Sequence, residues 1–122
     1  MSVFHLFAPT PPGIASLAGA LPSSSVMVGE GELRGTLYDL DDPGRVLLLY
    51  GETRIPGEIW RCPAESLPAL DRAAGVPGGT RRRVAREVPR PDGASPVACW
   101  LYVAGPALCH ELLPERRLAG PA

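Results

Sequence analysis

Proline and glycine divide this chain into short segments. Fifteen of the 122 residues are proline and 14 are glycine, and both types mark turns and interrupt regular helices. Pro9, Pro11 and Pro12 crowd one early loop, and Pro22 ends the helical pattern that follows it. We therefore expect a fold built from short strands and short helices.

The length suits one domain, because about 120 residues bury roughly two-thirds of the surface that the unfolded chain exposes. Hydrophobic residues make up 45% of the sequence, which is enough for a core. We predict a domain over residues 1–108 and a tail over residues 109–122 that is partly helical or frayed.

Charge and hydropathy exclude several classes of partner. The net charge is −1, so no overall field attracts nucleic acid. Neither a signal peptide nor a run of about 20 apolar residues is present, which predicts a cytoplasmic protein without a membrane partner. All 12 basic residues are arginine, and with the abundant Ala, Gly and Pro this suggests a GC-rich bacterial source.

The cysteines do not form a metal or disulfide pattern. Cys62, Cys99 and Cys109 are odd in number and widely spaced, unlike the paired ligands of zinc sites. We expect reduced, packed thiols, no metal site and no cofactor.

Hydrophobic patterning predicts strands and two helices. The helices are expected at residues 14–21 and 66–74, where apolar residues recur at helical spacing. Apolar or alternating runs predict strands at residues 3–7, 26–28, 35–40, 45–50, 55–62, 81–88 and 97–103. This mixture indicates an α+β domain around one curved sheet or barrel.

Several segments, in order, resemble the γ-glutamylcyclotransferase-like family, which includes plant avirulence-induced relatives. They are GTLYDL at residues 35–40, GEIW at 57–60, LDRAAG at 70–75, an arginine at Arg82 or Arg83, and WLYV at 100–103. The resemblance implies a small mixed β-barrel flanked by short helices, with a pocket at one end.

The resemblance also implies a reaction. In active members the amides of the first loop hold a γ-glutamyl group, and a glutamate after Leu-Asp acts as general base and acid. The substrate amine then attacks the γ-carbonyl and 5-oxoproline is released. Here Ala74 occupies the glutamate position, and Phe7, Ala8, Pro9 and Thr10 replace the Tyr-Gly-Ser/Thr-Leu loop. A methyl group accepts no proton and proline offers no amide, so we do not expect the usual activity.

Other residues remain candidates for chemistry. Glu58, or His5 if it faces the cavity, is a possible acid or base, although Glu58 also fits a structural anchor and His5 a packed side chain. For substrate binding, the resemblance and the aromatic rings predict Phe7, Ala8, Thr10, Tyr38, Ala74 and Tyr102, where core packing explains the tyrosines equally well.

An arginine run, Arg81 to Arg83 with Arg86, suits either a carboxylate or phosphate ligand or a charged strand edge that discourages aggregation.

Three functions stay open. The first is an enzyme that processes a small metabolite by cyclisation, amide processing or another tailoring step in a bacterial biosynthetic pathway. The second is a pseudoenzyme that binds a metabolite or a protein partner. The third is a cyclotransferase in which Glu58 has become the base. We expect a small-molecule ligand, and either a monomer or a homodimer.

Overall fold

Five strands form one mixed sheet in this computed structural model, which describes residues 2–41 and 43–118. The strands are β1 (Val3–Pro9), β2 (Val26–Asp39), β3 (Arg45–Pro63), β4 (Arg81–Val88) and β5 (Val97–Ala104). Their order in the sheet is β2-β3-β1-β5-β4. Neighbouring strands are antiparallel except β1 and β5, which are parallel.

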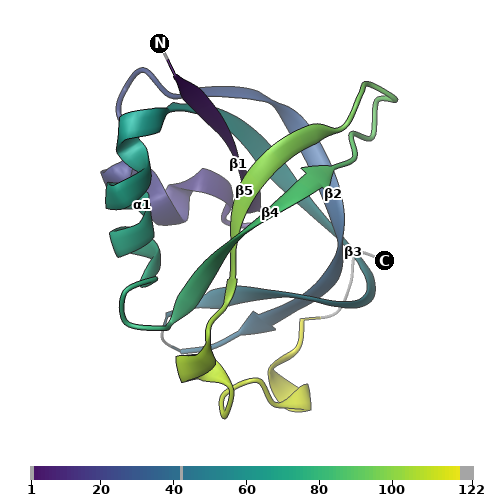
Figure 1. Cartoon of the computed structure of the whole chain (residues 1–122). Helices are drawn as coiled ribbons and strands as arrows, with labels where there is room; N and C mark the ends of the chain where they lie inside the picture. The colour runs from purple at the N-terminus through teal and green to yellow at the C-terminus, as the bar shows by residue number, and fades with distance from the viewer. Residues whose placement is uncertain (1, 42, 119–122) are drawn as a thin grey trace.

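Short helices complete the fold. They are η1 (Gly13–Ala20), η2 (Ala64–Ser66), α1 (Leu67–Ala74), η3 (Pro106–Leu108) and η4 (Pro114–Arg116). Figure 1 shows α1 and η1 on the same side of the sheet, while η3 and η4 lie at the lower end beyond β5. None of the helices in the described parts of the chain is long and apolar enough to cross a membrane.

The α+β class is confirmed, but the sheet is not a closed barrel. β2 and β4 are its two edges, and the sheet curls strongly between them (Figure 1). The edges approach each other where Glu32 N donates a hydrogen bond to Pro89 O, just after β4, at 3.0 Å. A strongly twisted sheet can curl this far without a continuous ladder between its edges.

Strands β2 and β3 each replace two shorter strands expected from the sequence. They form one long hairpin whose register shifts between Met27 and Gly29 and again between Gly35 and Thr36. Such irregularities bend a strand without ending it. Pro56 is tolerated within β3 because β1 has already ended at Pro9, which leaves β2 as the only neighbouring strand there.

Two hydrophobic clusters lie on opposite faces of the sheet. The first takes buried residues from all five strands, which is possible only because the sheet curls around it; its members are Phe7, Leu37, Leu47, Ile55, Ile59, Val88, Cys99, Leu101 and Val103. The second lies under α1 and η1 and includes Leu6, Cys62, Leu70, Ala74 and Tyr102. Phe7 and Leu6 therefore fall on different faces, as neighbours on a strand should.

Helix α1 begins and ends at the expected signals. Pro68 lies in its first turn, where a missing amide removes no intrahelical bond. Gly75 ends it in the left-handed conformation with φ 85°, and its amide donates to Arg72 O at 3.1 Å. Leu70 and Ala74 are buried on the face that packs against the sheet.

The cysteines are all free, but only two of them are packed. Cys62 and Cys99 are buried, whereas Cys109 is exposed just after η3. The expectation of packed thiols is therefore wrong for Cys109, because the turns beyond β5 lie at the surface.

Candidate ligand-binding cavity

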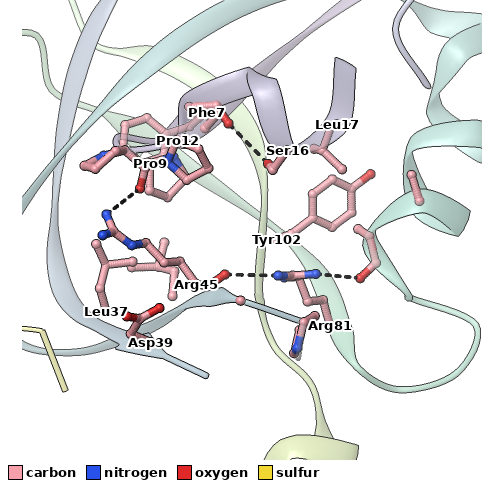
Figure 2. A pocket seen from close by; sticks show the side chains of 18 residues that line it. Phe7, Pro9, Pro12, Ser16, Leu17, Leu37, Asp39, Arg45, Arg81 and Tyr102 are labelled. Carbon is pink, nitrogen blue, oxygen red and sulfur yellow. Dashed lines mark hydrogen bonds between the residues drawn. The ribbon is translucent and has the colours of Figure 1, made fainter. Parts of the chain in front are cut away.

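A cavity of about 580 Å³ lies at one end of the curled sheet. Its walls come from the end of β1, the proline loop (residues 9–13), η1, the end of α1, the turn between β2 and β3, and single residues of β4 and β5. Figure 2 shows the side chains that line it. This volume is within the range of small-molecule sites.

One part of the wall is apolar and belongs to the core. Phe7, Leu37 and Leu47 are almost fully buried and pack in the first cluster, and each also lines the cavity. Leu17 from η1 and the rings of the proline loop extend this surface. A ligand with an apolar body would therefore find complementary surface here.

Two arginines and one aspartate supply the charge. Arg81 begins β4 and donates from Nη1 to Ala74 O at 3.2 Å and from Nη2 to Arg45 O at 3.0 Å. Arg45 begins β3 and donates from Nη1 to Pro11 O at 3.0 Å. Figure 2 shows both guanidinium groups with these bonds, and Asp39 below Arg45.

Burial acts on two of the polar groups. Loss of solvent around the guanidinium lowers the pKa of Arg81. Burial, together with the hydrogen bond and the negative charge of Asp71, raises the pKa of Tyr102. Its hydroxyl, which donates to Asp71 Oδ1 at 2.7 Å, therefore stays protonated at neutral pH and is not a base.

The structure brings four of the predicted site residues together. Phe7, Ala8, Ala74 and Tyr102 all line the cavity, although they come from β1, α1 and β5. Ala74 is only 1% exposed, so the methyl group forms part of a tightly packed wall.

The other predicted residues lie elsewhere. Glu58 and Thr10 line a second, smaller cavity of about 150 Å³. Tyr38 packs with Leu40 in a third hydrophobic cluster. His5 lies on β1 opposite Arg61 and lines neither cavity.

Glu58 has a structural environment. Its Oε1 accepts a hydrogen bond from Ile14 N at 2.9 Å and another from Trp60 Nε1 at 3.1 Å. The first of these holds the start of η1 against β3. The carboxylate thus satisfies a backbone donor at the start of a helix, as capping groups do.

Sequence reasoning missed Arg45 and Asp39 as cavity residues. They flank the turn between β2 and β3 and are paired across the hairpin. Their position beside the expected turn is the signal that could have identified them. Arg81 was singled out with its neighbours, but only the first residue of the run lines the cavity. Within the described ranges, no three His, Cys, Asp or Glu side chains gather as a metal site would require.

Solved structures with the same fold are known. An AIG2-like protein from Mus musculus is 19% identical, with a TM-score of 0.70 over 99% of this chain and 86% of the other. A gamma-glutamyl cyclotransferase is 16% identical, with a TM-score of 0.70 over 84% and 67%. A protein from Arabidopsis thaliana is 16% identical, with a TM-score of 0.68 over 100% and 78%. At these identities the likeness establishes the fold.

The family assignment comes from the sequence match. No curated protein matches the chain significantly. The model of the family described as gamma-glutamyl cyclotransferase, AIG2-like, however, matches residues 14–119. This range covers most of the chain, from η1 to beyond η4. The chain therefore belongs to the gamma-glutamyl cyclotransferase, AIG2-like family.

Proposed function

We propose that this protein binds a small metabolite in the 580 Å³ cavity and does not catalyse the cyclotransferase reaction that its family resemblance implies. The observation that carries the proposal is the position of Ala74. The resemblance places Ala74 where active relatives have their glutamate, and this residue lies on the cavity wall. A cavity thus lies where the resemblance implies that a proton acceptor has been replaced.

The missing carboxylate bears directly on catalysis. General acid–base assistance typically contributes about 10²- to 10⁴-fold in rate. Among the described residues, Asp39 is the only acidic side chain that lines the cavity. It belongs to the end of β2 rather than to α1.

The proline loop is also poorly suited to hold a γ-glutamyl group by its amides. Pro9, Pro11 and Pro12 have no N–H. The amide of Thr10 is already bonded to Pro56 O at 2.9 Å, and the amide of Ile14 is bonded to Glu58. Two separate parts of the reaction that the resemblance implies are thus changed in the same cavity.

The position of Glu58 argues against its use as a replacement base. Its carboxylate oxygen accepts two hydrogen bonds, from Ile14 and Trp60, and it lines the smaller cavity instead. A base must lie within hydrogen-bond reach of the proton that it removes. A substrate held against Ala74 would occupy the larger cavity, whose wall does not include Glu58.

A second candidate function is favoured by Asp39. An exposed carboxylate on the wall of the larger cavity offers a proton acceptor for a different reaction on the bound metabolite. Cyclisation, amide processing or another tailoring step in a bacterial biosynthetic pathway would use it. Orientation of the substrate in the cavity would add to the rate.

The test is a metabolite screen by thermal shift and by two-dimensional ¹H–¹⁵N NMR, since a ligand that binds only the folded state stabilises it. The variant Ser16→Trp places an indole on the cavity wall, because Ser16 is an exposed residue of η1 that lines the cavity. Its matched control is Ala15→Trp, which changes the exposed neighbour outside the cavity wall.

We expect ligands to shift amides of the proline loop, η1 and Tyr102 in the wild type and in Ala15→Trp, and to lose this effect in Ser16→Trp. No 5-oxoproline should be released from γ-glutamyl amines. Steady release of 5-oxoproline by the wild type, or ligands that bind equally well to Ser16→Trp, would contradict the proposal. For the second candidate, conversion of a bound metabolite should be lost in Asp39→Asn while binding persists.

A further inference from the structure

Two arginines, Arg45 and Arg81, line the larger cavity. Arg81 links the last residue of α1 to the first residue of β3 through the carbonyls of Ala74 and Arg45. Arg45 reaches the proline loop through Pro11 O. The backbone of Arg45 thus binds one guanidinium while its own side chain presents the other (Figure 2).

These bonds do not use the full hydrogen-bonding capacity of either arginine. A guanidinium has five N–H donors. Arg81 directs two nitrogens at carbonyl oxygens, and Arg45 directs one. With respect to the described residues, donors therefore remain on both side chains for a further acceptor.

No ion pair among the described residues balances the charge of these two arginines. Within residues 2–41 and 43–118, the ion pairs within 4.0 Å join Arg34 to Glu52, Arg54 to Glu32, Arg83 to Asp71 and Arg116 to Asp41. Arg45 and Arg81 are in none of them. Asp39 shares the cavity wall but forms none of these pairs either. Two arginines and one aspartate leave the wall with a net charge of about +1.

Burial makes this excess charge costly for the protein alone. Arg81 is only partly exposed, and the loss of solvent that lowers its pKa penalises the charged form. An anion in the cavity would offset that penalty, and a planar carboxylate matches the fork of a guanidinium.

We propose that Arg45 and Arg81 bind the carboxylate of a small monocarboxylate metabolite whose apolar body packs against Phe7, Leu37 and Leu47. This rests on the proposed function, because it assumes that the cavity binds a ligand. A single carboxylate matches a wall of charge +1 better than a phosphate monoester, which carries nearly two negative charges at neutral pH. The arginines would thereby replace the loop amides that Pro9, Pro11 and Pro12 have removed.

A purely structural role for Arg81 makes a different prediction. Its bond to Ala74 O lies at the end of α1, where a cation is favourable on its own. In that case a carboxylate would bind no better than a neutral molecule of the same shape. Arg45 helps to distinguish a structural role from ligand binding. Its guanidinium contacts the proline loop and not α1, so the argument from the helix end does not apply to it.

The experiment compares phenylacetate with phenylacetamide, which share an apolar body and differ in charge. Each is titrated into ¹⁵N-labelled protein, and dissociation constants are taken from the amide shifts of the cavity wall. Arg45→Gln and Arg81→Lys are the test variants, and Arg82→Gln is the control, because Arg82 is exposed on the same strand and lies outside the cavity wall. Arg81→Lys retains a charge and one donor group, so it keeps part of the link to α1.

We expect phenylacetate to bind about tenfold or more tightly than phenylacetamide, as loss of a charge-assisted hydrogen bond predicts. Arg45→Gln should remove most of this preference, Arg81→Lys should reduce it, and Arg82→Gln should leave it unchanged. If Arg81→Lys does not fold, Arg45→Gln decides the question alone.

Three results would overturn the inference. Equal binding of the acid and the amide at the cavity would overturn it while leaving the proposed function intact. Tighter binding of phenyl phosphate than of phenylacetate would overturn the assignment to a carboxylate. If neither acid nor amide shifted the cavity amides, the inference would fail, and the metabolite screen with Ser16→Trp would still decide the proposed function.

Discussion

The hydroxyl of Tyr102 donates a hydrogen bond of 2.7 Å to Asp71 Oδ1 and so joins β5 to α1. The other carboxylate oxygen of Asp71 accepts from Arg83 Nη1 at 2.8 Å, and the guanidinium of Arg83 lies 4.4 Å from the ring centre of Trp100. Because Tyr102 also lines the larger cavity, this network sets the distance between two of its walls.

Tyr102→Phe should therefore destabilise the fold. The substitution removes the hydroxyl donor and leaves Asp71 Oδ1 without this hydrogen bond. For a partly buried bond to a charged group, we expect the free energy of unfolding to fall by about 1–2 kcal/mol. The free energy of unfolding from urea titration measures the change. Tyr50→Phe is the control, since Tyr50 is 78% exposed, and an equal loss there would show that the Asp71 bond contributes nothing.

Cys99 predicts a loss of stability at alkaline pH. Burial raises its pKa from 9.0 to about 11, so the folded state holds this proton more tightly than the unfolded chain. The contribution is fully present below pH 9 and is lost as the pH rises through 11, by about 3 kcal/mol in all. Urea titrations between pH 8 and 11 should show a shallower decline for Cys99→Ala. Cys109→Ala, at an exposed site, should decline like the wild type.

Two substitutions of Glu58 distinguish a structural role for its carboxylate from a role as a catalytic base. Glu58→Ala removes the acceptor of the Ile14 amide and the Trp60 indole and should cost about 1–3 kcal/mol in the free energy of unfolding. Glu58→Gln retains an acceptor oxygen and should cost less than half as much. Glu52→Ala, which is exposed on the same strand, serves as the control. A stable Glu58→Gln variant that loses catalytic turnover would show instead that Glu58 is a base.

Gly105→Ala should disturb the start of β4. A Cβ at Gly105 would collide with Gly79 O and lie 3.0 Å from Arg81 N, so backbone must move. We expect a loss of about 1–3 kcal/mol in the free energy of unfolding, as for other overpacked sites, and NMR shifts at Arg81. Gly78→Ala is the matched control, because the nearest atom to its Cβ would be 3.9 Å away. Similar stability of the two variants would be evidence against the collision.

The sequence predicted local elements better than their connections. Residues 81–88 were expected as a strand with a basic face and form β4 with those bounds, because the glycines before Arg81 and the proline after Val88 limit the segment on both sides. The strands at residues 26–28 and 35–40 were expected to be separate. They are continuous in β2 because its two register shifts bend the ladder without ending it, and register shifts leave little trace in hydropathy.

The cavity residues were likewise predicted only in part, because some of them meet through contacts that are distant in the sequence. Phe7, Ala8 and Ala74 were expected at one site from the family resemblance, and Tyr102 because of its ring and hydroxyl. All four line the cavity. Arg45 joins them only because the turn between β2 and β3 folds back to the proline loop. That approach depends on the curl of the whole sheet, which no local pattern specifies.

The central place of β1 in the sheet has a consequence for how the molecule assembles. β1 comes first among the five strands along the sequence, yet it lies between β3 and β5, and its parallel contact joins Leu6 to Trp100. During synthesis β1 cannot pair on both of its edges until β3 and then β5 have also been made. Folding dominated by such distant pairings is slow, on the order of milliseconds to seconds, and leaves strand edges open to other chains meanwhile.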